Sequence, residues 1–200
     1  MKEIFYKGYI FKIFDQVYMP SDDTFLLAEY LDINPGEIVL DMGTGCGILA
    51  ILAAEKAHKV VGVDINPHAI ECALENAKLN GVDARKIVFR QGNLFEPICV
   101  NEKFNLIIFN PPYLPVDETR EEWLEKAWSG GKNGREVIDR FINEAPKYLK
   151  ENGRILLLQS TLSDVDRTVE NLRKLKLSVR VIAEEKLDFE SLMVILAEKT

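Results

Sequence analysis

The sequence is poor in cysteine and histidine and has no long apolar stretch. It holds three cysteines and two histidines among 200 residues. The odd number and wide spacing of Cys46, Cys72 and Cys99 argue against a disulfide scaffold or a zinc site and fit a reducing compartment. We therefore expect no bound metal and a cytoplasmic protein. An apolar run of about 20 residues is missing, and so is a signal peptide at the N-terminus, so no membrane association is expected.

A basic surplus is missing as well. The chain has 25 Lys and Arg against 32 Asp and Glu, a net charge of −7. Non-specific binding of nucleic acid depends on basic residues that neutralise phosphates, so we do not expect nucleic acid as a partner unless a local basic groove exists. The apolar fraction of 47% is typical of globular proteins. The length predicts one domain over residues 1–200.

Apolar runs that resemble strands alternate with helical periods along the chain. Strand patterns cover 38–45, 59–65, 86–91, 104–109, 154–159, 177–185 and 192–199. Helical patterns cover 48–57, 66–81, 134–149 and 163–176. This alternation predicts a doubly wound α/β fold with a mostly parallel, seven-stranded Rossmann-like sheet that ends in an antiparallel hairpin. Residues 1–36 fit the pattern least and are expected to add an N-terminal flap and helix to a core of residues 37–200.

A glycine-rich loop, DMGTGCG over Asp41–Gly47, follows the first strand of the predicted core. Its alternate glycines allow backbone conformations that other residues avoid and let a ligand approach the main chain. The G-x-G-x-x-G dinucleotide pattern fails, because Ile48 stands where its third glycine would be. Asp41 would repel a pyrophosphate but suits a ligand with a cationic part. S-adenosylmethionine, with an ammonium and a sulfonium group, meets that requirement.

Asp64 stands at the end of the next strand. An acidic residue at this point of a nucleotide-binding fold can accept hydrogen bonds from both ribose hydroxyls. Asp64 could instead serve as an acid near the start of the helix that follows Asn66. The loop and the acid together are more specific for a nucleoside ligand than either alone.

A second motif, Asn110-Pro111-Pro112-Tyr113, leaves the fourth strand of the predicted core. Two prolines restrict the backbone there, so the carbonyls of Asn110 and Pro111 should point in preset directions. A planar amide or amino nitrogen is a poor nucleophile because its lone pair is delocalised. Two acceptors, the side-chain oxygen of Asn110 and the backbone oxygen of Pro111, can orient such an NH2 group, and the Tyr113 ring offers it a flat apolar surface. The motif therefore favours methyl transfer to a planar nitrogen, although a plain strand terminator would also contain prolines.

Together these motifs resemble those of class I S-adenosylmethionine-dependent methyltransferases that act on planar nitrogens. The segments YMPSDDTFLLAEYL (18–31) and AWSGGKNGREVIDRF (127–141) are similar to the short branch of the HemK-type glutamine methyltransferases. The resemblance implies methylation of the glutamine in the Gly-Gly-Gln motif of a translation release factor. Adenine-N6 methylation of DNA or RNA and methylation of protein lysine are the alternatives.

The resemblance also implies which residues act. The substrate amide would be held by the turn Asn110, Pro111, Pro112 and Tyr113. The cofactor would contact Thr24, Asp41, Gly43, Thr44, Gly45, Gly47, Asp64, Ile65, Asn93, Leu94 and Asn110. Thr24 could equally be a structural residue of a helix, and Asn93 replaces an aspartate of many relatives. Members of this branch often pair with a small zinc-binding activator along an edge strand, here Lys86–Gln91, whose apolar residues could instead simply face the core.

Overall fold

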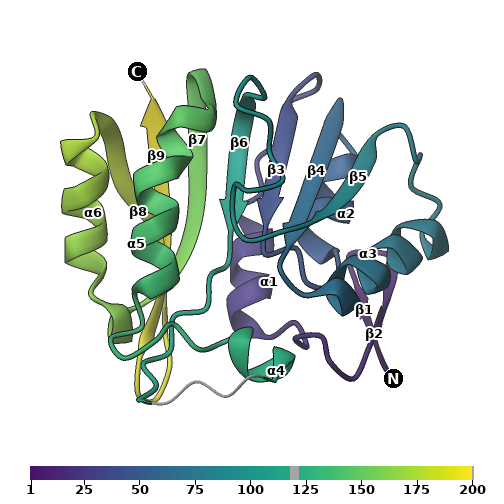
Figure 1. Ribbon diagram of the computed structural model, residues 1–200, viewed down its shortest axis with the longest axis horizontal. Coiled ribbons are helices and arrows are strands. Elements are labelled where there is room, and N and C mark those ends of the chain that lie inside the picture. The colour runs from purple at the N-terminus through teal and green to yellow at the C-terminus, as the bar shows by residue number, and fades with distance from the viewer. Residues whose placement is uncertain (118–121, 200) are drawn as a thin grey trace. The chain divides into compact units, whose positions relative to one another are not determined.

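The computed structural model of the chain describes residues 1–117 and 122–199 (Figure 1). Its strands are β1 (Lys2–Tyr6), β2 (Tyr9–Ile13), β3 (Ile38–Met42), β4 (Lys59–Asp64), β5 (Ile87–Gln91), β6 (Phe104–Phe109), β7 (Leu149–Ser160), β8 (Leu177–Lys186) and β9 (Ser191–Lys199). Its α-helices are α1 (Asp22–Glu29), α2 (Ile48–Ala54), α3 (Pro67–Leu79), α4 (Trp123–Lys126), α5 (Glu136–Glu144) and α6 (Val165–Lys174).

Seven of the strands form one mostly parallel sheet in the order β5-β4-β3-β6-β7-β9-β8. The strands β1 and β2 form a separate antiparallel ribbon. This arrangement confirms the predicted doubly wound α/β class, including the antiparallel hairpin of β8 and β9 at the end of the chain. The chain divides into two compact units, residues 1–99 and 100–200.

In the first unit, the strands β3, β4 and β5 pair in parallel, with Val60 opposite both Val39 and Ile87. The helix α3 begins and ends as the sequence predicts. Asn66 accepts a hydrogen bond from the backbone N–H of His68 at 2.9 Å, and Pro67 is the first helical residue. Gly81 lies just beyond the helix with φ of 66°. Both ends therefore follow from local residue chemistry.

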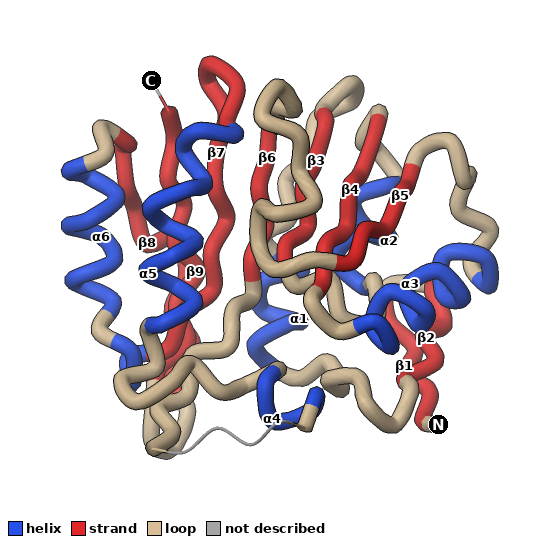
Figure 2. The backbone as a smooth tube through the Cα atoms, viewed as in Figure 1, coloured by secondary structure: helices blue, strands red, loops and turns tan. Residues whose placement is uncertain are grey.

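The β1–β2 ribbon packs against α3, as Figure 2 shows. Asn80 near the end of α3 accepts from the N–H of Ile10 at 2.9 Å and donates to its carbonyl at 2.8 Å. In the sequence of α3, Ile70, Ala73, Leu74 and Ala77 recur at helical spacing, which predicts that all four face the core. The structure corrects this expectation for Leu74. Leu74 is 42% exposed, and Asn76 is fully buried instead, because the ribbon offers backbone polar groups to that face.

In the second unit, β6 runs parallel to β7, and β7 and β8 both pair antiparallel with β9. The helices α5 and α6 lie side by side along these strands (Figure 1). The Phe141 ring of α5 packs at 4.6 Å from the ring of Phe109, the last residue of β6. The helical pattern that was expected to reach Leu149 changes to a 3-10 turn at Ala145–Tyr148, because Pro146 cannot donate an α-helical hydrogen bond.

In the part of the chain that the structure describes, none of the helices combines the length and the apolar character that crossing a membrane requires.

Candidate functional site

The glycine-rich loop after β3 uses three left-handed backbone positions. Gly43, Gly45 and Gly47 have φ of 66°, 55° and 85°. A Cβ on Gly47 would lie 2.9 Å from the Cβ of Ala73 in α3, so the loop and that helix can approach only if the residue is glycine. At Gly45 the space is open, and the nearest atom to a Cβ would be the Gly43 carbonyl oxygen at 4.0 Å. The loop thus presents bare backbone at Gly45.

Asp41 is completely buried beneath this loop. Its Oδ2 accepts from the Thr44 hydroxyl at 2.6 Å and from the Ala50 N–H at 3.1 Å. Its Oδ1 is also buried and has no hydrogen-bond partner among the described residues. Burial raises the pKa of Asp41 to about 7, against the opposing effect of those two donors. One carboxylate oxygen is therefore left for a donor that none of the described residues supplies.

Asp64 binds the loop from the end of β4. Its Oδ2 accepts from the Gly45 N–H and its Oδ1 from the Asn66 N–H, each at 2.9 Å. Burial raises its pKa, while those backbone donors act in the opposite direction. The contacts of Asp64 are therefore compatible both with binding of ribose hydroxyls and with a role as an acid near the start of α3. A carboxylate oxygen can accept more than one hydrogen bond. The neighbouring side chain of Ile65 is 46% exposed.

Asn93 and Leu94, the two candidate cofactor-binding residues after β5, lie in a tight turn close to Asp64. The N–H of Gly92 donates to the Asp64 carbonyl at 2.9 Å. The N–H of Asn93 donates to the Glu96 carboxylate at 3.1 Å. Leu94 is buried and has an unusual φ of 52°. The structure thus brings the segments that contain Gly45, Asp64 and Gly92 together, although they are far apart in sequence.

Thr24 lies in the first turn of α1 and is buried. Its hydroxyl donates to the Asp23 carboxylate at 3.1 Å, and Tyr18 donates to the same carboxylate at 3.0 Å. These contacts suit the structural role that the sequence left open.

Sequence reasoning missed Asn76, which supports the glycine loop from α3. The Asn76 Nδ2 donates to the carbonyl of Cys46, within the loop, at 2.8 Å, and to the carbonyl of Lys12 at 2.9 Å. Its Oδ1 accepts from the Lys12 N–H at 2.8 Å. An asparagine among apolar positions of a helical face was the available signal, since a buried amide must find partners.

The candidate acceptor region belongs to the second unit and begins where β6 ends. The side-chain oxygen of Asn110 is shielded from solvent, Pro111 is buried, and Pro112 and Tyr113 are half-buried. Leu114 then pairs with a distant segment. Its N–H donates to the carbonyl of Trp128 at 3.0 Å, and its own carbonyl accepts from the N–H of Gly130 at 2.9 Å. The NPPY turn is therefore held at both ends.

The chemistry of the glycine-rich loop and Asp64 suits a nucleoside with a cationic substituent. The Oδ1 of Asp41 is a buried acceptor that requires a donor, and the open backbone at Gly45 allows close approach of a ligand. The half-buried carboxyl of Asp64 accepts a hydrogen bond from this backbone. On these observations the residues present fit S-adenosylmethionine.

Comparison with known proteins decides the family. The methyltransferase small domain family matches residues 21–189. The chain belongs to this methyltransferase family. The match spans the glycine loop, Asp64 and the NPPY turn, so both candidate regions lie within the methyltransferase domain.

Relatives of this methyltransferase carry related names. It is 45% identical to a Methanocaldococcus jannaschii protein that is provisionally named a protein N5-glutamine methyltransferase, over 94% of this chain and 95% of the relative. It is 37% identical to human methyltransferase HEMK2 over 72% of each chain. It is 38% identical to the release factor glutamine methyltransferase of Aquifex aeolicus, over 75% of this chain and 57% of that longer relative.

Solved structures of methyltransferases are similar to this chain in fold. The E. cuniculi Mtq2–Trm112 complex, described as responsible for methylation of the translation termination factor eRF1, contains a chain with a TM-score of 0.71 and 25% identity. That match covers 92% of this methyltransferase and 99% of the solved chain. The tRNA m1G37 methyltransferase of M. jannaschii has a TM-score of 0.72 at 23% identity, over 99% of this chain and 56% of its own, and shows the shared fold alone.

Proposed function

We propose that this methyltransferase transfers a methyl group from S-adenosylmethionine to the side-chain amide of a protein glutamine, namely that of the Gly-Gly-Gln motif in a translation release factor. The observation that carries the proposal is the NPPY turn, with its shielded Asn110 oxygen and buried Pro111, in a chain that shares 45% identity with a relative named for N5-glutamine methylation. The reaction takes place in the cytoplasm, and residues 1–36 and 37–200 act as one domain.

The donor is held by the first unit. Within the glycine-rich loop, Thr44 donates to the buried carboxyl of Asp41, and Gly43, Gly45 and Gly47 present the backbone. Asp64 accepts the ribose hydroxyls. Thr24, Ile65, Asn93 and Leu94 also contact the cofactor. Once bound, the cofactor supplies an electrophilic methyl group on a positively charged sulfur. The orphaned Oδ1 of Asp41 supports this assignment, since a cationic ligand would satisfy it.

The acceptor is held by the NPPY turn of the second unit. Asn110 Oδ1 and the Pro111 carbonyl each accept one N–H of the amide, Pro112 keeps the turn rigid, and the Tyr113 ring supports the amide plane. Asn110 also borders the cofactor. Hydrogen bonds to both N–H groups favour the positive charge that develops on nitrogen during transfer. The proton leaves after the methyl group has arrived, so the turn acts mainly by orientation.

A labelled methyl-transfer assay with a purified release factor tests this function. We expect one methyl group per factor, located at the glutamine of Gly-Gly-Gln by peptide mass spectrometry. A factor with Gln→Ala at that position should remain unlabelled. Labelling that persists after this substitution would overturn the assignment of glutamine, and a Gln→Lys factor that becomes a better substrate would identify lysine as the acceptor.

We also propose a small zinc-binding activator subunit at β5. β5 lies at one edge of the sheet, and an edge strand can accept a further strand. The Mtq2–Trm112 complex supports the idea of a partner protein. The side chains of β5 do not favour it, since Ile87 is buried and Phe89 covers Gly62. Hydrogen exchange tests it: an activator that binds there slows exchange of β5 amides, and unchanged exchange in an active complex places the partner elsewhere.

A further inference from the structure

We infer that Arg135 is a positioning residue for methyl transfer: it fixes the glycine-rich segment 129–134 against the NPPY turn and so sets the direction of the turn's carbonyls. The inference rests on the proposed function of that turn. Arg135 is 2% exposed, and its side chain is among the largest that are fully buried. Arg135 immediately precedes α5 and is far from the turn in sequence.

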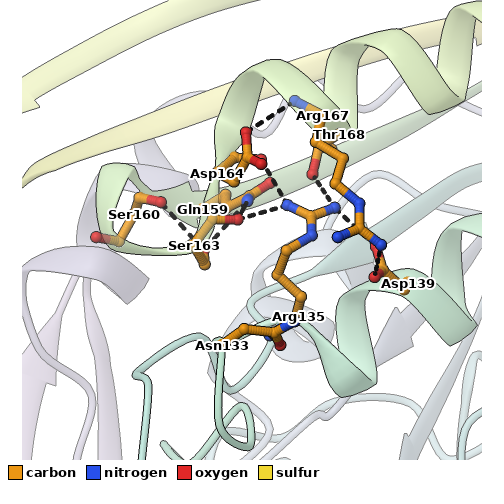
Figure 3. A network of polar contacts seen from close by, with 9 residues as sticks. All are labelled: Asn133, Arg135, Asp139, Gln159, Ser160, Ser163, Asp164, Arg167 and Thr168. Carbon is orange, nitrogen blue, oxygen red and sulfur yellow. Dashed lines mark hydrogen bonds and ion pairs between the residues drawn. The ribbon is translucent and has the colours of Figure 1, made fainter.

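The guanidinium of Arg135 is enclosed by the 3-10 turn Thr161–Ser163 that follows β7, the start of α6, and Asp139 of the adjoining helix α5 (Figure 3). Its Nη1 donates to the carbonyls of Ser163 and Asp164. Its Nη2 donates to Asp139 Oδ1 at 2.7 Å and to Thr168 Oγ1 at 3.0 Å. Four contacts to three elements fix the side chain in one orientation. A lysine could not reproduce them, because its ammonium is a single point rather than a planar fork.

The backbone next to Arg135 transmits this anchor to the NPPY turn. Gly134 has φ of 70°, and a Cβ there would lie 2.2 Å from the carbonyl oxygen of Tyr113. The segment is thus in direct contact with the last residue of the turn. Farther along, Gly130 donates to the Leu114 carbonyl at 2.9 Å and Val116 donates to the Gly131 carbonyl at 3.0 Å.

The segment is also compact in itself, so a shift at one end reaches the other. Gly134 donates to the carbonyl of Gly131, and Glu136 donates to the carbonyl of Gly130, each at 3.0 Å. A Cβ on Gly130 would lie 2.6 Å from the Gly134 carbonyl carbon. Loss of the Arg135 anchor therefore loosens Tyr113 and Leu114, and with them the preset direction of the Pro111 carbonyl. Reactions that depend on orientation lose rate steeply when such a group moves by about 1 Å.

The test compares Arg135→Lys with two other variants of the full chain. Thr168→Val removes a single hydrogen bond from Nη2 with little change of shape. Arg167→Gln is the matched control, since Arg167 contacts Asp139 Oδ2 at 2.8 Å from the exposed side and does not touch the segment 129–134 in the described contacts. Turnover is expressed per cofactor-binding site, counted by calorimetry, so that an unfolded fraction does not lower it.

For Arg135→Lys we expect a fall in kcat of about 100-fold with cofactor Kd unchanged. For Thr168→Val we expect a fall of about three- to tenfold, and for Arg167→Gln none. Unchanged kcat per site in Thr168→Val overturns the inference even if the lysine variant does not fold. So does an equal loss of kcat in Arg167→Gln.

A second measurement does not depend on the substrate. Amide hydrogen exchange of Leu114, Val116 and Gly130 should accelerate in Thr168→Val while exchange of Thr44 and Gly45 stays constant. Exchange that does not change at the three former amides overturns the positioning role. If the exchange accelerates but wild-type protein does not methylate glutamine, the proposed function fails while the link between Arg135 and the turn holds.

Discussion

The carboxylate of Asp64 accepts the backbone N–H of Gly45 at 2.9 Å, across a sequence separation of 19 residues. The same residue accepts the N–H of Asn66 through its other oxygen. Asp64 therefore holds the glycine loop to the start of α3 before any ligand binds. This double use means that its removal affects both the shape of the loop and the contacts to the ribose.

The first prediction concerns Asp64→Ala. We expect cofactor affinity to fall by about 10- to 100-fold, because a charged hydrogen-bond partner and the support of the Gly45 N–H are lost together. Calorimetric titration with S-adenosylmethionine measures the change. Glu71→Ala, at an exposed position of α3, is the matched control and should leave affinity unchanged. Equal affinities in the two variants would disprove the role of Asp64.

The second prediction concerns Pro111→Ala in the NPPY turn. A less restricted backbone should hold the carbonyl of residue 111 less firmly, so turnover falls by about tenfold or more while cofactor affinity is preserved. Steady-state methylation and calorimetry on the same preparation separate the two effects. Pro115→Ala, at an exposed position shortly after the turn, should keep full turnover. A loss confined to cofactor affinity would contradict the assignment of the turn to the acceptor.

The third prediction follows from the buried carboxyl of Asp41. Its pKa rises from 3.8 to about 7 in the folded chain. Between these values the folded chain retains a proton that the unfolded chain has released, so this residue makes stability fall as pH rises from 3.8 to about 7. Above that window its contribution is constant. Asp41→Asn cannot titrate and should lack this slope.

Urea unfolding at several pH values measures that slope as the pH dependence of the difference in unfolding free energy between wild type and Asp41→Asn. The comparison removes the contribution of other acidic groups, including Asp64, whose pKa is also raised. A difference that grows in favour of wild type as pH rises would show the opposite shift and refute the assignment.

The fourth prediction compares two asparagines of α3. Asn76→Ala should lower the free energy of unfolding by about 2–4 kcal/mol, because it leaves the half-buried N–H of Lys12 and the buried carbonyl of Cys46 without their partner. Asn80→Ala removes a similar pair of bonds to Ile10 at a more exposed position, so we expect a loss below about 1 kcal/mol. Equal losses in urea unfolding would mean that burial is not the deciding factor.

The elements of the fold were predictable because each has a local signature. The uniform apolar strands, the cap at Asn66 and the proline at position 67 depend on residues within a few positions of one another. Prediction from local sequence failed where a segment distant in sequence packs against an element. Leu74 was expected in the core, but the β1–β2 ribbon covers the neighbouring face of α3 and Leu74 remains exposed.

The candidate site likewise was predicted only in part from the sequence. The sequence identified the glycine loop, Asp64 and the NPPY turn, because those residue types and spacings are unusual and the chemistry restricts them. It did not indicate that Asp41 is fully buried with one oxygen unpartnered among the described residues, or that Asn76 supports the loop. Those properties depend on which groups surround a side chain.

Periodicity and local backbone preference were therefore enough to predict the α/β class and the order of elements, and the residue types available for methyl transfer are read from the sequence directly. Tertiary structure alone decided which polar groups are buried and what they contact. The guanidinium of Arg135, enclosed by Ser163, Asp164 and Thr168, illustrates the reason. Desolvation and hydrogen bonding act between groups that only the folded chain brings within a few ångströms of each other.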